Sequence, residues 1–473
     1  SIMREDWEEC RFEDLLDYEQ PTNYIVKSTA YNDAYETPVL TAGKSFIKGY
    51  TNETEGIFDN LPTIIFDDFT TASQFVNFKF KVKSSAMKIL VPTSKLVNMD
   101  FAYYAMQVNQ IRSDTHKRYW ISVYAKKIFL LPSAVEQDSI VSKIEELLSD
   151  LDKGIADLKK AEHQLKVYRQ AVLKKAFEGE LTKEWREQQT DLPTADELLG
   201  QIKEERQKHY EQQIENWKEA LKAWEENGKE GKKPTKTPIY KNFNSPVRPL
   251  DLSLPTSWFF DCVGNLCSKT EYGSSSKSLL TGEVPVLRMG NMQEGKIDWT
   301  DLKYSIDMNE INQYLLKKGD VLFNRTNSPE LVGKTVEYKG ERPAIFAGYL
   351  IRLNQIENII SGTYLNHFLN SHSAKVYGSF VKTDGVNQSN INGDKLSNYP
   401  IPFCSLNEQH QIVQEIESRL SVCDKVEESI IESLEKAKAL RQSILKKAFE
   451  GTLLSEEEIA ACKAAPDYEP ASV

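Results

Sequence analysis

The sequence has no apolar run that approaches the roughly 18 residues that a membrane-spanning helix needs. Its N-terminus, SIMREDWEEC, is acidic, whereas a secretory signal peptide is basic and then apolar. The six cysteines form no CxxC pair, which disfavours both a disulfide framework and a zinc site. These absences predict a cytoplasmic protein with reduced thiols and no bound metal.

Sequence signatures of catalysis are also missing, because no HExxH, GxSxG, GxGxxG or NPPY motif occurs. The segment TAGKSF at 41–46 ends like a phosphate-binding loop, but Pro38 stands where that loop needs a glycine. Asp67 and Asp68 could be the metal ligands of a nuclease, yet no acidic-x-Lys partner follows them, so a structural or DNA-reading role is favoured. A chain of 473 residues without a catalytic constellation predicts a binding or scaffolding protein.

The acidic excess is confined to part of the chain. The net charge of -11 would argue against nucleic-acid binding if it were spread evenly. Residues 136–182, 183–233, 408–454 and 455–473 carry the whole deficit, with net charges of -2, -3, -2 and -4. Residues 79–127 carry a net charge of +8. Because a polyanion responds to the field within a Debye length of ~8–10 Å, the acidic total does not exclude DNA.

An internal repeat organises the chain. The heptapeptide LKKAFEG occurs at Leu173–Gly179 and again at Leu445–Gly451, which is an offset of 272 residues. At this offset residues 136–182 align with 408–454 without a gap, and 21 of the 47 positions are identical. Both copies begin with Glu-Gln and end with the same heptapeptide, so the chain is an approximate duplication.

Both copies of the repeat have the heptad spacing of long paired helices. The expected seam residues are Ile144, Leu147, Leu151, Leu158, Ala161, Leu165, Tyr168 and Val172 in the first copy, and Ile416, Leu420, Cys423, Ile430, Leu434, Ala437, Leu440 and Ile444 in the second. Gly179 and Gly451 stand where a glycine would end each helix. We expect the two helices to pair as a coiled coil, and separate packing of each helix on its own domain is the alternative.

The region before each helix alternates short apolar runs with turn residues, as in TIIFDDFTT at 63–71 and DVLFNRTNS at 320–328. Short helical patterns follow at 101–108 and 364–369. The sequence therefore predicts an α+β fold with two tandem domains, each a small mixed β-sheet or barrel-like core with short helices, and each followed by a long helix.

We predict domains at 1–133 and 254–403, long helices at 134–182 and 404–455, a charged helical insert and linker at 183–253, and a disordered acidic tail at 456–473. Thr194 and Glu197 predict a capping box at the start of a charged helix over 194–227. The Gly-, Pro- and Lys-rich residues after it predict a flexible linker. A solvated linker helix is favoured, and a docking surface for another subunit is the alternative.

The duplicated helix, headed by Glu-Gln after Leu131-Pro132 or shortly after Ile401-Pro402 and closed by LKKAFEG, resembles the specificity subunit of type I restriction-modification enzymes. The segment VNQSNI at 386–391 adds to this resemblance. It implies two target-recognition domains that each read half of a bipartite DNA target, and antiparallel helices that act as a ruler between them. It also implies a non-catalytic subunit for phage defence, which binds two adenine-N6 DNA methyltransferase subunits and is joined by restriction subunits. S-adenosylmethionine, ATP and Mg²⁺ would be bound by those partners.

The resemblance and the loop chemistry together predict which residues contact DNA, because groove edges and phosphates are read by cationic, amide and hydroxyl side chains on loops. In the first domain the candidates are Lys27, Ser28, Tyr31, Lys44, Thr70, Thr71, Lys79, Lys81, Lys83, His116, Lys117 and Arg118. In the second domain they are Lys269, Tyr272, Ser275, Lys277, Arg288, Asn324, Arg325, Asn327, Lys334, Lys382, Asn387, Gln388 and Asn390. The alternatives are a stand-alone nuclease or NTPase, and a coiled-coil scaffold that does not bind DNA.

Overall fold

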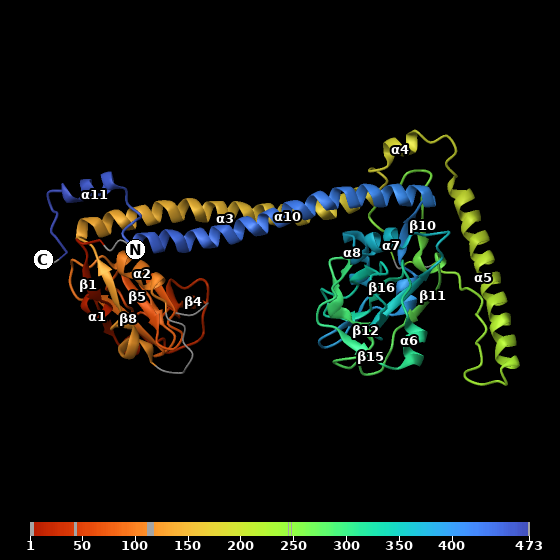
Figure 1. Ribbon diagram of the computed structural model, residues 1–473, viewed down its shortest axis with the longest axis horizontal. Coiled ribbons are helices and arrows are strands. Elements are labelled where there is room, and N and C mark those ends of the chain that lie inside the picture. The colour runs from red at the N-terminus through yellow and green to blue at the C-terminus, as the bar shows by residue number, and fades with distance from the viewer. Residues whose placement is uncertain (1–3, 42–44, 111–117, 245, 247, 472–473) are drawn as a thin grey trace. The chain divides into compact units, whose positions relative to one another are not determined.

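The computed structural model describes residues 4–41, 45–110, 118–244, 246 and 248–471 (Figure 1). The chain forms two compact units, one of residues 1–161 with 429–473 and one of residues 162–428. Unit 1 contains the first α+β domain, unit 2 contains the second, and each unit contains part of both long helices. In the described part of the chain, no helix is long and apolar enough to cross a membrane.

The first domain contains two small sheets and a strand pair. Its antiparallel sheet has the order β2-β8-β5-β6, with β2 at Leu16–Glu19, β5 at Thr63–Asp67, β6 at Ser73–Val76 and β8 at Met87–Pro92. A second sheet has the order β4-β3-β7, with β3 at Thr37–Leu40, β4 at Ile47–Thr51 and β7 at Lys81–Val82. Strand β1 (Glu8–Arg11) pairs with β9 (Ile128–Leu131), and helix α2 spans Met99–Val108.

Strand β5 is apolar at successive positions because both of its faces are buried. Ile64 and Phe66 pack in a cluster that includes Phe101 of α2, whereas Ile65 packs in a second cluster with Val76. Successive side chains of a strand point to opposite faces, so a strand covered on both sides reads as a continuous apolar run. This explains the TIIF segment that the sequence analysis interpreted as a strand.

The second domain repeats the strand order of the first. Its antiparallel sheet has the order β11-β20-β16-β18, with β11 at Cys267–Tyr272, β16 at Val321–Asn324, β18 at Thr335–Glu337 and β20 at Leu350–Gln355. The next sheet has the order β15-β12-β19, with β12 at Val284–Leu287, β15 at Lys303–Ser305 and β19 at Ile345–Phe346. Strand β10 (Phe259–Cys262) pairs with β23 (Pro400–Phe403). The helices include α6 (Met308–Tyr314), α7 (Gly362–Leu369), α8 (His372–Val381) and α9 (Gly393–Ser397).

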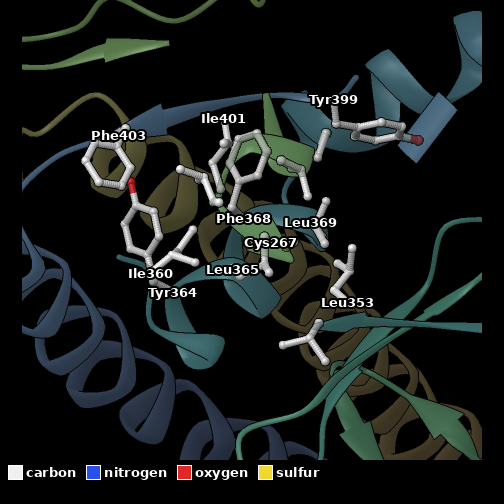
Figure 2. Packing of buried hydrophobic residues seen from close by; sticks show 14 of the residues in the cluster. Cys267, Leu353, Ile360, Tyr364, Leu365, Phe368, Leu369, Tyr399, Ile401 and Phe403 are labelled. Carbon is white, nitrogen blue, oxygen red and sulfur yellow. The ribbon is translucent and has the colours of Figure 1, made fainter. Parts of the chain in front are cut away.

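The core of the second domain joins its sheets to the end of the first long helix. Figure 2 shows Tyr364 and Phe368 of α7 in one cluster with Phe403 of β23. The ring of Phe177, from the last turn of that long helix, lies 5.3 Å from the Tyr364 ring and 5.2 Å from the Phe368 ring. Aromatic pairs at this separation and near-perpendicular angle are favourable, so the helix end is an integral part of this core.

The two long helices have the same length and the same ending. Helix α3 spans Ala134–Phe177 and helix α10 spans Leu406–Phe449, and each has 44 residues. Gly179 and Gly451 have φ values of +71° and +72°, which glycine adopts without strain. The backbone N–H of each glycine donates to the carbonyl three residues back, as in a Schellman motif. The predicted C-terminal glycines are confirmed.

The helices run antiparallel in both units. In unit 2, Arg169 of α3 lies 2.7 Å from Asp424 of α10, and in unit 1, Arg441 of α10 lies 3.0 Å from Asp152 of α3. These ion pairs are the same contact of the repeat, because each residue of one pair stands 272 positions from its counterpart in the other. The predicted pairing is confirmed.

The seam prediction was wrong at one position of the repeat. Tyr168 and its counterpart Leu440 are 47% and 51% exposed, so both point away from the partner helix. In an antiparallel pair the ends of each helix also pack on a domain, and this contact shifts the buried face away from a strict heptad.

The insert forms α4 (Lys183–Glu187) and α5 (Ala195–Glu226), and the predicted capping box at Thr194 is present. The start of α5 is not a free linker helix, because Leu198 and Ile202 are buried in the core cluster of the second domain. The expected flexible linker lies along the far part of α5 (Figure 1), where Trp217 Nε1 donates a hydrogen bond to the carbonyl of Pro234.

One further expectation, the disordered tail, was wrong. The first part of the acidic tail forms helix α11 (Glu456–Lys463), which Ser455 caps, and Cys462 on this helix is buried in a core cluster of unit 1. A local capping box and one apolar face are sufficient to order it. In addition, the described residues form no closed barrel in either domain, since sheets of four and three strands fall short of the roughly eight strands that close around a side-chain core.

Candidate nucleic-acid interface

Two of the predicted DNA-reading segments meet in one small sheet of the second domain. Its strand order is β17-β22-β21, with β17 at Thr326–Asn327, β21 at Thr383–Asp384 and β22 at Ser389–Asn390. Asn390 Nδ2 donates a 2.8 Å hydrogen bond to Thr326 Oγ1 across β17 and β22. The sheet, which we call the polar ribbon, pairs Thr326 with Asn390 and Asn327 with Ser389, although the two strands are far apart in sequence.

The hairpin of the polar ribbon presents amide groups at its tip. Asn387 and Gln388 are exposed, and Val386 between the strands is 100% exposed. The turn is closed by a 2.7 Å hydrogen bond from Gly385 N to the Gln388 carbonyl. At its base, Lys382 lies 2.8 Å from Asp384, and the hydrogen bond from Lys382 lowers the pKa of that carboxyl. A two-stranded hairpin with exposed amides is a type of element that can read base edges in the major groove.

Arg325 is held against the ring of Tyr272, beside the polar ribbon. Its guanidinium lies 4.8 Å from the ring centre of Tyr272, and its Nε donates to the Gly348 carbonyl at 2.9 Å. The Tyr272 hydroxyl in turn accepts a 2.9 Å hydrogen bond from Gly393 N. An arginine that is already stacked and oriented loses little entropy when it binds a phosphate or a guanine edge.

One cation at this site was missed by the sequence analysis. Lys395 Nζ donates a 2.6 Å hydrogen bond to Thr383 Oγ1 at the edge of the polar ribbon. It belongs to the short helix α9, which follows the hairpin directly. Its position only a few residues after VNQSNI was the one available signal.

The remaining candidates of the second domain are not part of the polar ribbon. Lys269 pairs with Glu271 on β11, Arg288 donates to the Asp301 carbonyl, and Lys334 donates to Gln293. Ser275 and Lys277 are exposed in the loop after β11. Asn324 is a correction: its side chain is fully buried in β16, so it cannot reach a DNA groove.

Lys81 is a second correction, because its side chain is buried and supports a loop of the first domain. Its Nζ donates to the carbonyls of Glu55 and Gly56 and lies 3.3 Å from the Glu53 carboxylate. Burial would raise the pKa of Glu53, but hydrogen bonds from Ser28 N, Lys27 N and Lys81 outweigh it and lower the pKa. Lys27 and Ser28 are therefore held in an exposed turn, while Lys81 is structural.

Arg118 lies beside the turn that contains Thr70. The backbone N–H groups of Tyr119 and Trp120 donate to the carbonyl and carboxylate of Asp68, and this fixes the following segment on the β5-β6 turn. Asp67 accepts hydrogen bonds from the backbone of that turn. Both aspartates thus have structural partners, and among the described residues no group of acidic, histidine or cysteine side chains could hold a metal.

Other candidates of the first domain differ in accessibility. Thr71 is buried and has a φ of +61°, so the predicted DNA contact of its side chain is corrected to a role in the turn. The Tyr31 hydroxyl is also buried. Lys79 and Lys83 are exposed. Lys44, His116 and Lys117 lie outside the described residues.

Each long helix is anchored to its domain by the same glutamate. Trp7 Nε1 donates to Glu136 at 3.3 Å, and Trp258 Nε1 donates to Glu408 at 2.9 Å. Arg4 completes the first anchor at 3.0 Å from Glu136, and burial is the main reason that the pKa of Glu136 is raised. Arg186 of α4 completes the second.

The glutamine of the repeated Glu-Gln pair also has one role in both copies. Gln137 Nε2 donates to the Pro132 carbonyl at 3.0 Å, and Gln409 Nε2 donates to the Cys404 carbonyl at the same distance. In the sequence the Glu-Gln pair contributes to the family resemblance, but no pattern there indicates its role. The structure shows that it fixes each helix start on its domain.

Comparison with known proteins agrees with this arrangement. Residues 257–436 match the family described as type I restriction modification DNA specificity domain. The specificity subunit of the type I restriction enzyme EcoR124I/EcoR124II from Escherichia coli is 27% identical over 445 residues, which are 91% of this chain and 89% of that subunit. The chain is similar to the specificity subunits of type I restriction-modification systems, and these matches support a subunit of that kind.

A second relative and a solved structure extend the comparison. The StySPI specificity subunit of Salmonella potsdam is 25% identical over 69% of this chain, and the match spans 58% of that subunit. A solved chain from a study of complex assembly and conformational transition of the type I R-M system has a TM-score of 0.63 and 15% identity. The superposition covers 96% of this chain and all of that chain, so the two have the same fold. The relatives are specificity subunits, which recognise DNA and are not the catalytic components of their complexes.

Proposed function

We propose that this specificity subunit reads a bipartite DNA target, one half with each α+β domain. The duplication carries the proposal: both domains have the same strand order, and both long helices begin at the same Glu-Gln anchor. Two equivalent domains on two equivalent helices are suited to two half-sites at a fixed separation. A continuous helix holds its two ends at a fixed distance, whereas a flexible Gly- or Ser-rich linker does not.

We also propose how the complex assembles. Two adenine-N6 DNA methyltransferase subunits bind the paired helices α3 and α10, and restriction subunits join the resulting complex. S-adenosylmethionine, ATP and Mg²⁺ are bound by those partners. The six cysteines are all free and the proposed substrate is cellular and invading DNA, which supports a cytoplasmic location.

Methylome sequencing of cells with and without this chain tests the proposal. We expect one bipartite methylated motif that disappears when the chain is deleted and returns when it is restored. A methylome that does not depend on the chain would contradict DNA recognition.

A second experiment tests the polar ribbon in the complete complex. We expect Arg325→Ala to weaken specific DNA binding by about 1–3 kcal/mol and to relax one half of the motif, because a stacked arginine is a specific base or phosphate contact. Neutralising Arg118 together with Lys117 should weaken binding and flatten its salt dependence. The matched control is Lys232→Ala, an exposed cation of the linker along α5. An unchanged motif and affinity for the Arg325 variant would remove the polar ribbon from the interface.

A further inference from the structure

The hairpin of the polar ribbon protrudes from the second domain between two buried anchors. Val381, the last residue of α8, and Ile391, which follows β22, are both buried in the core cluster of that domain. Val386 lies midway between them in sequence and is 100% exposed. The segment therefore contains three β-branched apolar residues, of which the outer two stabilise the fold and the middle one faces solvent.

Several interactions make this protrusion rigid. Strand β22 pairs with both β21 and β17. Asp384 accepts hydrogen bonds from Lys382 and Ser389, and Ile391 N donates a 2.9 Å hydrogen bond to the Arg325 carbonyl. A rigid element loses little conformational entropy when it binds, so the tip of the hairpin is suited to recognition.

Neither packing nor turn geometry explains a valine at this tip. Turns favour Gly, Asn, Asp, Pro and Ser, whereas valine favours strands. An isopropyl group that is fully exposed removes no apolar surface from water in the folded domain. Contact with an apolar group of a ligand would give the Val386 side chain a role.

The tip carries no charge, and this limits which part of DNA it can read. Residues 385–390 are Gly, Val, Asn, Gln, Ser and Asn, and the charged residues before them, Lys382 and Asp384, pair with each other. Arginine and lysine are the usual contacts of phosphates and guanine edges, and carboxylates accept from cytosine N4. The amides of Asn and Gln bind adenine, and apolar side chains contact the thymine methyl group. The tip thus contains both kinds of group that read an A·T pair.

Two amides are available beside the valine. Asn390 already donates to Thr326, whereas the side chains of Asn387 and Gln388 are exposed and have no hydrogen-bond partner within the described part of the chain. Adenine N6 and N7 lie in the major groove, as does the methyl group of the paired thymine. One base pair can therefore contact the valine and an amide at the same time.

We propose that the hairpin tip reads an A·T base pair in the major groove. Val386 contacts the C5-methyl group of the thymine, and the amide of Asn387 or Gln388 binds N6 and N7 of the adenine. Val386 is then a specificity-determining residue, and the half-site of the second domain contains at least one such base pair. This inference rests on the proposed function, because it requires that the second domain binds one half of the DNA target.

The test measures binding of the full-length chain, co-expressed with the methyltransferase subunits, to duplexes that carry the methylated motif. Each thymine of the motif is replaced in turn by uracil, which keeps the base pair and lacks the methyl group. We expect uracil at one position to weaken binding about fourfold, as the loss of one buried methyl group predicts. Val386→Ala should weaken binding to the thymine duplex at least as much, and it should abolish the difference between thymine and uracil at that position. A difference that persists in the Val386 variant, or no sensitivity to uracil anywhere in the motif, would overturn the inference.

Ile239→Ala is the matched control, because Ile239 is an apolar linker residue that is 82% exposed. This variant should retain both the affinity and the uracil sensitivity of the wild type. A complex that binds the motif but tolerates uracil at every position would leave the proposed function intact. A wild-type complex without affinity for the motif would instead contradict the proposed function.

The amide contact is checked with 7-deazaadenine in the same base pair, because this base lacks the N7 acceptor. It should weaken wild-type binding by about threefold to tenfold, which corresponds to one hydrogen bond. It should have no further effect on the double variant Asn387→Ala and Gln388→Ala. Equal sensitivity of the wild type and the double variant would overturn the assignment of the amides.

Discussion

The ends and the middle of the long helices have diverged to different degrees. Residues 154–165 share no identity with 426–437, although both segments are helical throughout. The ends retain the Glu-Gln anchor, the Asp–Arg pair and the LKKAFEG closure in both copies. A helical middle needs only apolar residues at the right spacing, whereas the ends make specific contacts with a domain. The repeat therefore conserves the residues that make specific contacts more strictly than the residues that only need to form a helix.

The two α+β domains show the same contrast. Their main sheets have the same strand order, and within the described residues the second domain adds the polar ribbon and the hairpin of β13 (Met292–Gln293) and β14 (Lys296–Ile297). A shared scaffold with different additions is expected of two domains that read different half-sites, because loops change without loss of the core. The following predictions test how far the two halves are equivalent.

The largest expected effect is on the spacing of the target. Insertion of seven residues into the middle of α3, with a matching insertion in α10, adds two helical turns or about 10 Å to the pair. We expect methylation of the original motif to be lost and a motif with the same half-sites and a longer gap to appear. Methylome sequencing measures both.

Two results would limit this prediction. A seven-residue insertion in α3 alone should disturb the antiparallel register and reduce methylation at all sites. An unchanged gap after the matched insertion would show that the helices do not set the distance between half-sites.

The next effect concerns the glycines that end the helices. A Cβ at Gly179 would lie 2.5 Å from Cγ of Pro255, a rigid ring, whereas a Cβ at Gly451 would lie 2.5 Å from Cγ of Arg4, a flexible side chain. Both positions have positive φ, so alanine is strained at either one. We expect Gly179→Ala to destabilise unit 2 by about 2–4 kcal/mol and Gly451→Ala to destabilise unit 1 by about 1–2 kcal/mol.

Hydrogen exchange measures this difference because it reports each unit separately. Gly154→Ala is the control, since a Cβ there meets nothing within 4 Å and helix propensity rises by roughly 0.5–1 kcal/mol. Equal losses at Gly179 and Gly451 would show that backbone strain, and not the neighbouring residue, dominates.

The sequence predicted the two long helices better than it predicted which candidate DNA-contact residues are exposed. Periodicity and the repeat were sufficient for α3, α10 and their glycine caps, because those features are local or duplicated. They could not show that Lys81 is buried, because its burial depends on Glu53 and the carbonyls of a distant loop. Likewise, Asn324 and Arg325 are neighbours in sequence, but Asn324 ends the fully buried strand β16, whereas Arg325 follows the strand and is partly exposed.

Acid should affect the two units differently, because His367 in unit 2 is largely buried and its pKa is lowered to about 4 by that burial and by Lys339. The unfolded chain binds a proton near pH 6.5, whereas the folded chain does not until about pH 4, so stability is lost as pH falls through that window. At pH 5 the loss should be about 2 kcal/mol. The described residues of unit 1 contain no histidine.

Hydrogen exchange at pH 7 and pH 5, corrected for intrinsic rates, checks this prediction. His367→Gln should make the stability of unit 2 less dependent on pH, whereas His163→Gln, at an exposed position of α3, should have no effect. Equal acid sensitivity of the two units in the wild type and in the His367 variant would refute the assignment.

The smallest expected difference lies in the repeated Asp–Arg pair itself. Arg169 contacts Glu427 at 2.9 Å as well as Asp424, but the position equivalent to Glu427 in unit 1 is Ile155, so among the described residues Arg441 forms an ion pair with Asp152 alone. Exposed ion pairs contribute roughly 0–1 kcal/mol, and a second carboxylate on a less exposed arginine should place Arg169 near the upper limit. We expect Arg169→Ala to destabilise the helix pair by about 1 kcal/mol and Arg441→Ala by about 0.5 kcal/mol.

Exchange rates of the adjacent helix amides at low and high salt measure both losses. High salt should reduce each loss, and a greater loss at Arg441 would show that the extra carboxylate is not stabilising.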